Sequence, residues 1–140
     1  MKLLEVELSN DPHIITRTVL PFEEVDDKNK KPFKTTVFSF IRVKVENNRE
    51  TEEYIITAKR GFEYDGASIP FNIGKGDMRL LIPALFHDIM CEAKGIIGRN
   101  RNLSSKIFRE LLIQCKVNKV QAQFMYLCVD NYQRVMRGWK

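Results

Sequence analysis

The sequence predicts an α+β protein in which an N-terminal antiparallel β-sheet packs against about three C-terminal α-helices. Apolar and polar residues alternate through much of residues 1–61, as they do in half-buried strands. Within residues 77–140 the apolar residues recur at intervals of three and four, the period of an amphipathic helix. Strands that come first and helices that follow are typical of the α+β class. We expect one domain of 140 residues, with a motif loop at 62–76 between the two parts.

The strands of the N-terminal part follow from alternation and from turn residues. Residues 4–9 alternate apolar and polar side chains, and residues 14–20 form a second apolar segment. Residues 37–45 are expected to form a longer strand, whose inward face takes every second residue: Val37, Ser39, Ile41, Val43 and Val45. Turn-forming residues at 46–50 precede residues 54–59, so these last two segments are predicted to pair as an antiparallel hairpin.

The first helix has two alternative starts. Pro83 suits the first position of a helix, because a helix start leaves that amide unpaired in any case. A helix that begins there is expected to run to about Lys94 and to stop at Gly95. Pro83 can instead kink a longer helix that begins near Asp77.

Two more helices are predicted downstream. Asn102 is the expected cap of the second helix, whose apolar stripe consists of Leu103, Ile107, Phe108, Leu111, Leu112 and Cys115. The third helix is expected to run from about Lys119 to Arg137. Its predicted inward residues are Val120, Phe124, Leu127, Cys128 and Val135.

The composition is that of an ordinary soluble globular protein, with 44% hydrophobic and 29% charged residues. No stretch approaches the ~18 uninterrupted apolar residues that cross a bilayer, so we expect no transmembrane segment. The N-terminus lacks the apolar stretch of a signal peptide. Cys91, Cys115 and Cys128 are an odd and widely spaced set. We therefore expect reduced thiols and synthesis in a reducing cytoplasm.

The net charge of +5 is unevenly distributed along the chain. Residues 94–140 carry ten Lys and Arg against two acidic residues, a charge of +8. This basic C-terminal half could meet an anionic surface such as nucleic acid, phospholipid or lipopolysaccharide. Because the cations are spread out without a dense run, the pattern favours a solvated helical surface over a dedicated binding site.

Two polar clusters interrupt the apolar sequence between residues 62 and 91, and they contain the candidate functional residues. One is His87 with Asp88, inside a strongly hydrophobic segment. The other contains Asp65 and Ser68. Burying ionisable groups is unfavourable unless they are paired, bound to a metal or used in chemistry, so these clusters mark a candidate site.

The spacing of His87 and Asp88 limits what they can do together. Adjacent residues on a helix point about 100° apart, so Asp88 is not placed to orient the ring of His87. Either both side chains reach one metal or substrate, or His87 takes its partner from Asp65 or Asp130. A carboxylate–histidine pair would support general-base chemistry on a water molecule. Asp88 would then be able to ligate a divalent cation such as Ca²⁺ or Mg²⁺, with His87 as a further candidate ligand.

A structural interpretation of the same residues stands beside the catalytic one. Asp65 and Ser68 fit a turn in which both bond to nearby backbone. With His87 and Asp88 they can form a buried polar network that holds the sheet to the first helix. The two interpretations are equally supported by these residues, since polar clusters of this kind occur in both settings.

Two motifs in the same order resemble the phage and prophage family of unknown function numbered 1353. Residues 62–70 resemble the family segment Phe-x-Thr-Asp-x-Ala-Ser-x-Pro. Residues 83–91 resemble a family helix in which Pro-Ala is followed by His-Asp-x-x-Tyr. The resemblance extends over about residues 54–139. Three residues depart from the pattern: Tyr64 replaces threonine, Cys91 replaces an aromatic residue and Ser105 replaces an acid. The resemblance implies a phage or prophage origin and names no activity.

Two functions are compatible with these observations. The first is a non-enzymatic virion-associated or accessory phage protein, which the missing acid and the lack of a full catalytic motif favour. Its expected partners are other phage proteins or a host factor, and its expected location is the host cytoplasm at synthesis, with the virion as a further destination. The alternative is a small metal- or His/Asp-dependent hydrolase acting on host envelope or lipid. His87 would be its base, Asp88 and Asp65 cation ligands or orienting groups, and Ser68 a hydrogen-bonding group.

Overall fold

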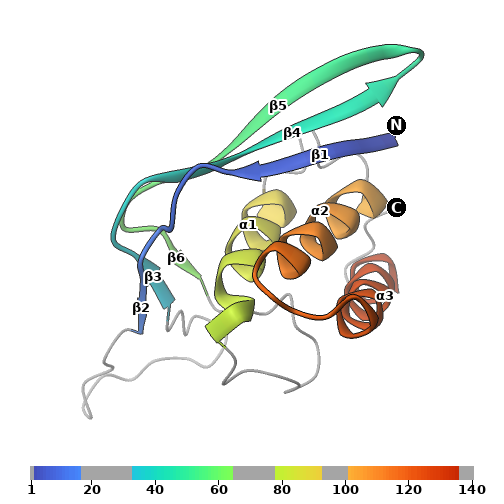
Figure 1. Ribbon diagram of the computed structural model, residues 1–140. Coiled ribbons are helices and arrows are strands. Elements are labelled where there is room, and N and C mark those ends of the chain that lie inside the picture. The colour runs from blue at the N-terminus through green and yellow to red at the C-terminus, as the bar shows by residue number, and fades with distance from the viewer. Residues whose placement is uncertain (1, 17–32, 65–77, 93–100, 136–140) are drawn as a thin grey trace.

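The computed structural model describes residues 2–16, 33–64, 78–92 and 101–135. In this part of the chain, N-terminal antiparallel sheets are followed by three C-terminal helices (Figure 1), which confirms the predicted α+β class. Within the described residues, no helix is long and apolar enough to cross a membrane.

The larger sheet has three antiparallel strands: β1 (Lys2–Leu8), β4 (Ser39–Asn47) and β5 (Glu50–Ala58), in the order β1-β4-β5. The central strand β4 turns the predicted face inward, and Ser39, Ile41, Val43 and Val45 are fully buried there. Val37 was also predicted on that face, but it precedes the strand and is exposed. Alternation along β4 therefore positions most of the sheet's contribution to the core.

The hairpin between β4 and β5 has a two-residue turn. Asn48 and Arg49 both adopt positive φ angles, 52° and 68°, as a type I′ turn requires. Asn47 pairs with Glu50 directly beside the turn, and the pairing continues without a register shift to Ser39 and Ala58. β5 thus begins four residues before the predicted strand at 54–59.

A smaller sheet contains the strands β2 (Ile14–Thr16), β3 (Phe33–Thr35) and β6 (Glu63–Tyr64), in the order β2-β3-β6. β6 is the start of the predicted motif loop. Its Tyr64 pairs with Phe33, and the two ring centroids lie 5.4 Å apart. This pairing fixes the start of the first motif against the body of the protein.

The first helix, α1 (Leu81–Glu92), follows a 3₁₀ turn, η2 (Met78–Leu80). α1 begins two residues before Pro83 and four after Asp77, so the start at Pro83 is the closer of the two predicted starts, and only the preceding 3₁₀ turn extends back toward Asp77. Pro83 lies within the first turn of α1, where its missing amide removes no intrahelical hydrogen bond.

The second helix, α2 (Arg101–Gln114), has the predicted stripe on its inner side, and Leu103, Ile107, Phe108, Leu111 and Leu112 are all buried there. Asn102 does not cap α2, because the helix already includes it and its amide donates a hydrogen bond to the Tyr126 hydroxyl.

α2 ends in a Schellman-type turn. Lys116 has a positive φ of 75°, and the Val117 amide donates to the Leu112 carbonyl at 3.0 Å. Asn118 then caps the third helix, α3 (Lys119–Val135), by accepting from the Gln121 amide at 2.8 Å. The short connection makes α3 a direct neighbour of α2.

The inward face of α3 differs from the prediction. The buried residues are Ala122, Met125, Tyr126, Val129 and Gln133. Of the predicted inward residues, Cys128 is half-buried, and the other four are exposed: Val120, Phe124, Leu127 and Val135. α3 carries apolar residues on two opposite faces, so their spacing alone does not indicate which face is buried. Polar contacts with α2, described below, select the face that contains Tyr126.

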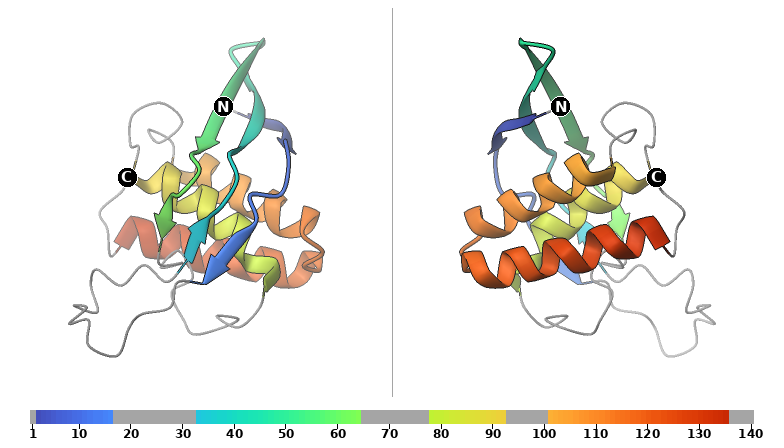
Figure 2. Two further views of the ribbon diagram at one scale, coloured as in Figure 1. Left: turned by 90° about the vertical axis from the view of Figure 1, so that its left-hand side faces the viewer. Right: turned by 90° about the vertical axis from the view of Figure 1, so that its right-hand side faces the viewer.

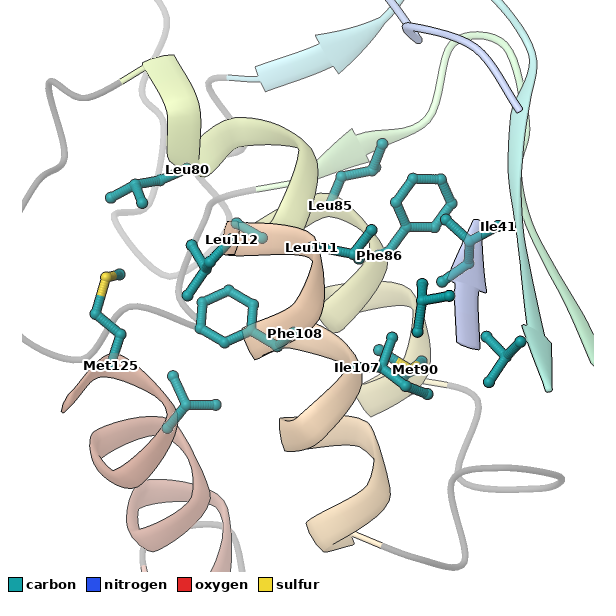
Figure 3. Packing of buried hydrophobic residues seen from close by; sticks show 14 of the residues in the cluster. Ile41, Leu80, Leu85, Phe86, Met90, Ile107, Phe108, Leu111, Leu112 and Met125 are labelled. Carbon is teal, nitrogen blue, oxygen red and sulfur yellow. The ribbon is translucent and has the colours of Figure 1, made fainter. Parts of the chain in front are cut away.

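The helices form two layers beneath the larger sheet. α1 lies against β5, α2 lies against β1, and α3 packs on the far side of α2 (Figures 1 and 2). Figure 3 shows the core where these layers meet, with Phe86 of α1 directed toward Ile41 of the sheet. Burial of these side chains is the main source of stability, at roughly 2 kcal/mol for each large one.

Candidate functional site

The structure brings together some of the predicted site residues. His87 and Asp88 lie on α1, and Asp130 lies on the part of α3 that packs on α2. Asp65 and Ser68 lie outside the described residues, so their predicted contacts with His87 and Asp88 stay predictions.

His87 faces the interior of the helical layers. Its exposed fraction is 0%, and its ring packs on Phe108 of α2 with the ring centroids 5.2 Å apart. The apolar residues on either side of His87 in α1 direct this turn of the helix toward the core, since Ala84, Phe86 and Met90 are also buried.

Burial decides the protonation of His87. Removal from water lowers its pKa to about 4, although the Asp130 carboxylate acts in the opposite direction. His87 is therefore neutral at pH 7, and one ring nitrogen donates while the other accepts. A neutral imidazole is the chemical form of a base or a metal ligand, but the ring has no solvent-exposed surface from which to act.

Within the described residues, Cys91 is the polar partner of the His87 ring. It lies one turn further along α1, with its Sγ 3.6 Å from Nδ1 and 4.0 Å from Nε2. Residues four apart share one face of a helix, which is why the thiol reaches the imidazole. The pair satisfies part of the hydrogen-bonding capacity of a buried ring. Cys91, Cys115 and Cys128 form no disulfide.

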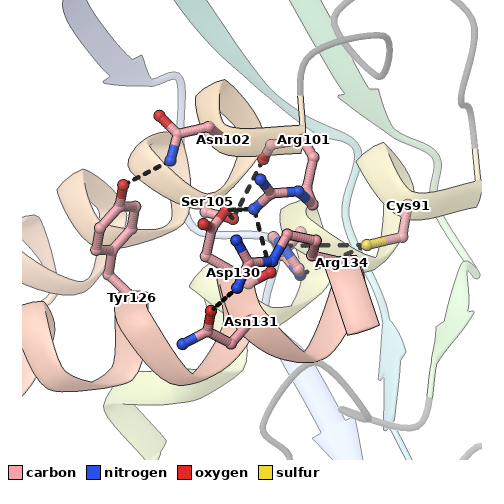
Figure 4. Close-up of polar contacts among 9 residues, drawn as sticks. Cys91, Arg101, Asn102, Ser105, Tyr126, Asp130, Asn131 and Arg134 are labelled. Atoms are coloured by element: carbon pink, nitrogen blue, oxygen red, sulfur yellow. Dashed lines mark hydrogen bonds and ion pairs between the residues drawn. The ribbon is translucent and has the colours of Figure 1, made fainter. Parts of the chain in front are cut away.

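Asp130 pairs with α2 rather than with His87. Its carboxylate forms an ion pair with Arg101 and accepts a hydrogen bond from Ser105 Oγ at 2.9 Å (Figure 4). Arg101 also donates to the backbone carbonyl of Asp130 at 3.1 Å. No hydrogen bond joins Asp130 to His87, so Asp130 does not orient the ring as a triad carboxylate would.

We call Arg101, Ser105 and Asp130 the interhelix cluster. Arg101 and Asp130 retain little exposure and Ser105 has none, so their mutual contacts replace water at the α2–α3 interface. Sequence reasoning treated Ser105 only as the loss of a family acid and did not identify Arg101. The available signal was a serine four residues after an arginine, placed beside the apolar stripe of α2.

Asp88 lies on the side of α1 that faces the motif strand β6. It is half-buried, and its carboxylate adds to the effect of burial in raising the pKa of Tyr64. The Tyr64 hydroxyl donates to the Leu81 carbonyl at 2.7 Å. Tyr64, which departs from the family pattern, thus connects the start of the motif loop to the first turn of α1.

The described residues offer limited support for a metal site. Among residues 2–16, 33–64, 78–92 and 101–135, no three His, Cys, Asp or Glu side chains lie close enough to hold an ion. Among the described residues, the side chain within hydrogen-bonding distance of the His87 ring is a thiol, whereas Ca²⁺ and Mg²⁺ prefer oxygen ligands.

Comparison with curated proteins and with solved structures gives no match. One family model matches residues 41–129, which span strand β4 to most of α3 and include both motifs. The match covers more than half of the chain. The chain therefore belongs to the family described as "Protein of unknown function (DUF1353)".

Proposed function

We propose that this chain is a non-enzymatic accessory or virion-associated protein of a phage or prophage, in which the polar groups around α1 are structural. The observation that supports this most is the complete burial of His87, the residue on which a hydrolytic mechanism would depend. A general base has to reach the proton that it removes, directly or through one water molecule. A ring covered by Phe108 and Cys91 has no such access.

Two further polar residues of the described part of the chain, Asp130 and Tyr64, also have structural partners. Asp130 is held by Arg101 and Ser105, and this cluster joins α2 to α3. Tyr64 bonds to the backbone of α1 and thereby joins the small sheet to the helices. Buried groups with such partners stabilise one arrangement of the elements, because any other arrangement leaves them unpaired.

The phage association rests on the family resemblance carried by the two motifs. A protein of this kind acts by contact, so its partners in this proposal are other phage proteins or a host factor. It is synthesised in the host cytoplasm and can enter the virion. Detection of the chain by mass spectrometry in purified particles of its phage would support virion association, and its absence from them would limit it to an accessory role in the cell.

The structural role and the hydrolase alternative predict different results for His87→Ala. Under our proposal this variant has a lower melting temperature than the unmodified protein. His13→Ala is the matched control, because the only other histidine is exposed and leaves the melting temperature unchanged. Hydrolysis of ester, phosphodiester and glycosidic substrates, measured with Ca²⁺ or Mg²⁺, should stay at background for all three proteins. An unchanged melting temperature together with a hydrolytic activity that His87→Ala abolishes would contradict the proposal.

A further inference from the structure

The outer edge of β5 is an open strand edge of unusual regularity. β5 is the last strand of the β1-β4-β5 sheet, and among the described residues no strand pairs with its outer side. Its nine residues contain no proline, glycine or lysine, and its pairing with β4 shows no bulge. Proteins ordinarily use proline, lysine and bulges to prevent edge-to-edge pairing of strands, and β5 has none of the three. The opposite edge strand, β1, has such a feature, a register shift between Leu3 and Glu5.

The register of the hairpin identifies the backbone groups on the open edge. Beside a two-residue turn, Asn47 and Glu50 form a hydrogen-bonded pair, and every second pair along the ladder repeats it. The even-numbered residues of β5 therefore direct their amides and carbonyls toward β4. Thr51, Glu53, Ile55 and Thr57 direct theirs toward the open side, where they can pair with another strand.

The side chains of β5 are arranged so that the strand complements itself in the antiparallel direction. Its first half carries Glu50, Glu52 and Glu53, and Lys59 and Arg60 follow directly after its last residue. The centre between these charges is apolar. Ile55 is 57% exposed on the solvent side, and Tyr54 and Ile56 are half-buried on the helix side. Acidic, apolar and basic segments in this order match a second copy that runs in the opposite direction.

We propose that this protein forms a two-fold symmetric dimer by antiparallel pairing of β5 with β5 of a second copy. In the register that best matches the charges, Ile55 lies on the two-fold axis opposite itself. Glu53 then pairs with Thr57 of the other copy through two backbone hydrogen bonds. Lys59, directly after the strand, lies opposite Thr51 and diagonally across from Glu53 of the other copy, so each end of the paired strands places a base near an acid. The result is one continuous six-stranded sheet, with both helical layers on the same side.

Another exposed apolar surface, on α3, does not complement itself in this way. The outward face of α3 exposes Val120, Phe124, Leu127 and Val135. Lys119 and Arg134 flank that face at its two ends, and both are exposed. A second copy packed there brings cation near cation in the parallel and in the antiparallel orientation. Charge therefore favours the β5 edge for pairing between two copies.

Sedimentation equilibrium tests the dimer with backbone variants. At about 100 µM the unmodified chain should show twice its mass of 16.4 kDa, and Ile55→Pro should weaken association by about tenfold or more. That proline removes an amide on the open edge and leaves the hydrogen bonds to β4 in place. Ile55→Val keeps the amide and should keep the dimer. Circular dichroism establishes that each variant is folded.

A charge exchange tests the register. Glu53→Lys and Lys59→Glu each place like charges diagonally across the paired strands and should weaken the dimer, whereas an equimolar mixture of the two restores opposite charges at both ends. The mixture should therefore associate more tightly than either variant alone. Phe124→Lys on α3 is the control for the other surface and should leave association unchanged.

Three results would overturn the dimer: a monomer at this concentration, a dimer that Ile55→Pro does not weaken, or a dimer that Phe124→Lys dissociates. The dimer does not depend on the role of His87, so its failure would leave the proposed function in place.

Discussion

Ser105 on α2 donates a hydrogen bond to Asp130 on α3 across 2.9 Å, at a position where the serine has no exposed surface. With the ion pair between Arg101 and Asp130, this bond determines which face of α3 meets α2. The alternative rotation of α3 would bury Phe124 and Leu127, but it would also turn Asp130 away from Arg101. Leaving one member of a largely buried ion pair without its partner costs several kcal/mol, so the polar cluster decides between two apolar faces.

Ser105→Ala should destabilise the protein by about 1–2 kcal/mol, because the Asp130 carboxylate loses a hydrogen bond that water does not readily replace. Urea unfolding followed by circular dichroism measures the change. Asn131→Ala is the matched control, since Asn131 accepts a bond from Arg134 on the exposed side of the same helix. Equal stability of Ser105→Ala and the unmodified protein would show that the bond does not contribute.

The outward position of the predicted α3 stripe gives a second prediction. Leu127→Gln should change the free energy of unfolding by less than about 0.5 kcal/mol, because Leu127 is 49% exposed and lies on the outward face of α3. Met125→Ala should cost about 2–4 kcal/mol, because Met125 belongs to the buried cluster. Thermal unfolding compares the two. A greater loss for Leu127→Gln than for Met125→Ala would mean that α3 packs in the rotation expected from the sequence.

The sequence predicts those elements whose buried face has no competitor. The alternation in residues 39–45 and the stripe of α2 each allow one arrangement, and both are observed. The predicted inward face of α3 was wrong, because apolar residues recur with a helical period on two faces of this helix. Which of the two faces is buried depends on the contact between Arg101 and Asp130, which lie 29 residues apart in the sequence. A contact over that separation is a tertiary effect that no local pattern contains. The sequence likewise does not determine whether His87 is buried, because a histidine in apolar sequence is compatible with a core position and with a cleft.

Tyr64 should make stability depend on pH in the alkaline range. Burial raises the pKa of Tyr64 above its ordinary value of 10.0, and the Asp88 carboxylate raises it further. The folded protein therefore keeps the phenol proton at a pH where the unfolded chain loses it, so this contribution to stability is complete below pH 10 and decreases above it. Tyr64→Phe removes this dependence and also a hydrogen bond to Leu81, at a cost of about 1 kcal/mol near neutral pH. Between pH 9 and 11 the free energy of unfolding should fall less steeply with pH for Tyr64→Phe than for the unmodified protein. Equal slopes would contradict the prediction.

His87 should make stability depend on pH in the acidic range, where stability falls as the pH falls. Burial lowers its pKa from 6.5 to about 4, so between these values the unfolded chain binds a proton that the folded protein does not. Stability from this group is complete above pH 6.5 and is lost as the pH falls toward 4, by about 3 kcal/mol at most. His87→Leu removes the group, so its free energy of unfolding should change less between pH 7 and pH 5 than that of the unmodified protein. His13→Ala, which removes the exposed histidine, should retain the full decrease. If His87→Leu and the unmodified protein lose stability equally over this range, His87 is not held neutral in the folded state, and the main support for its structural role is lost.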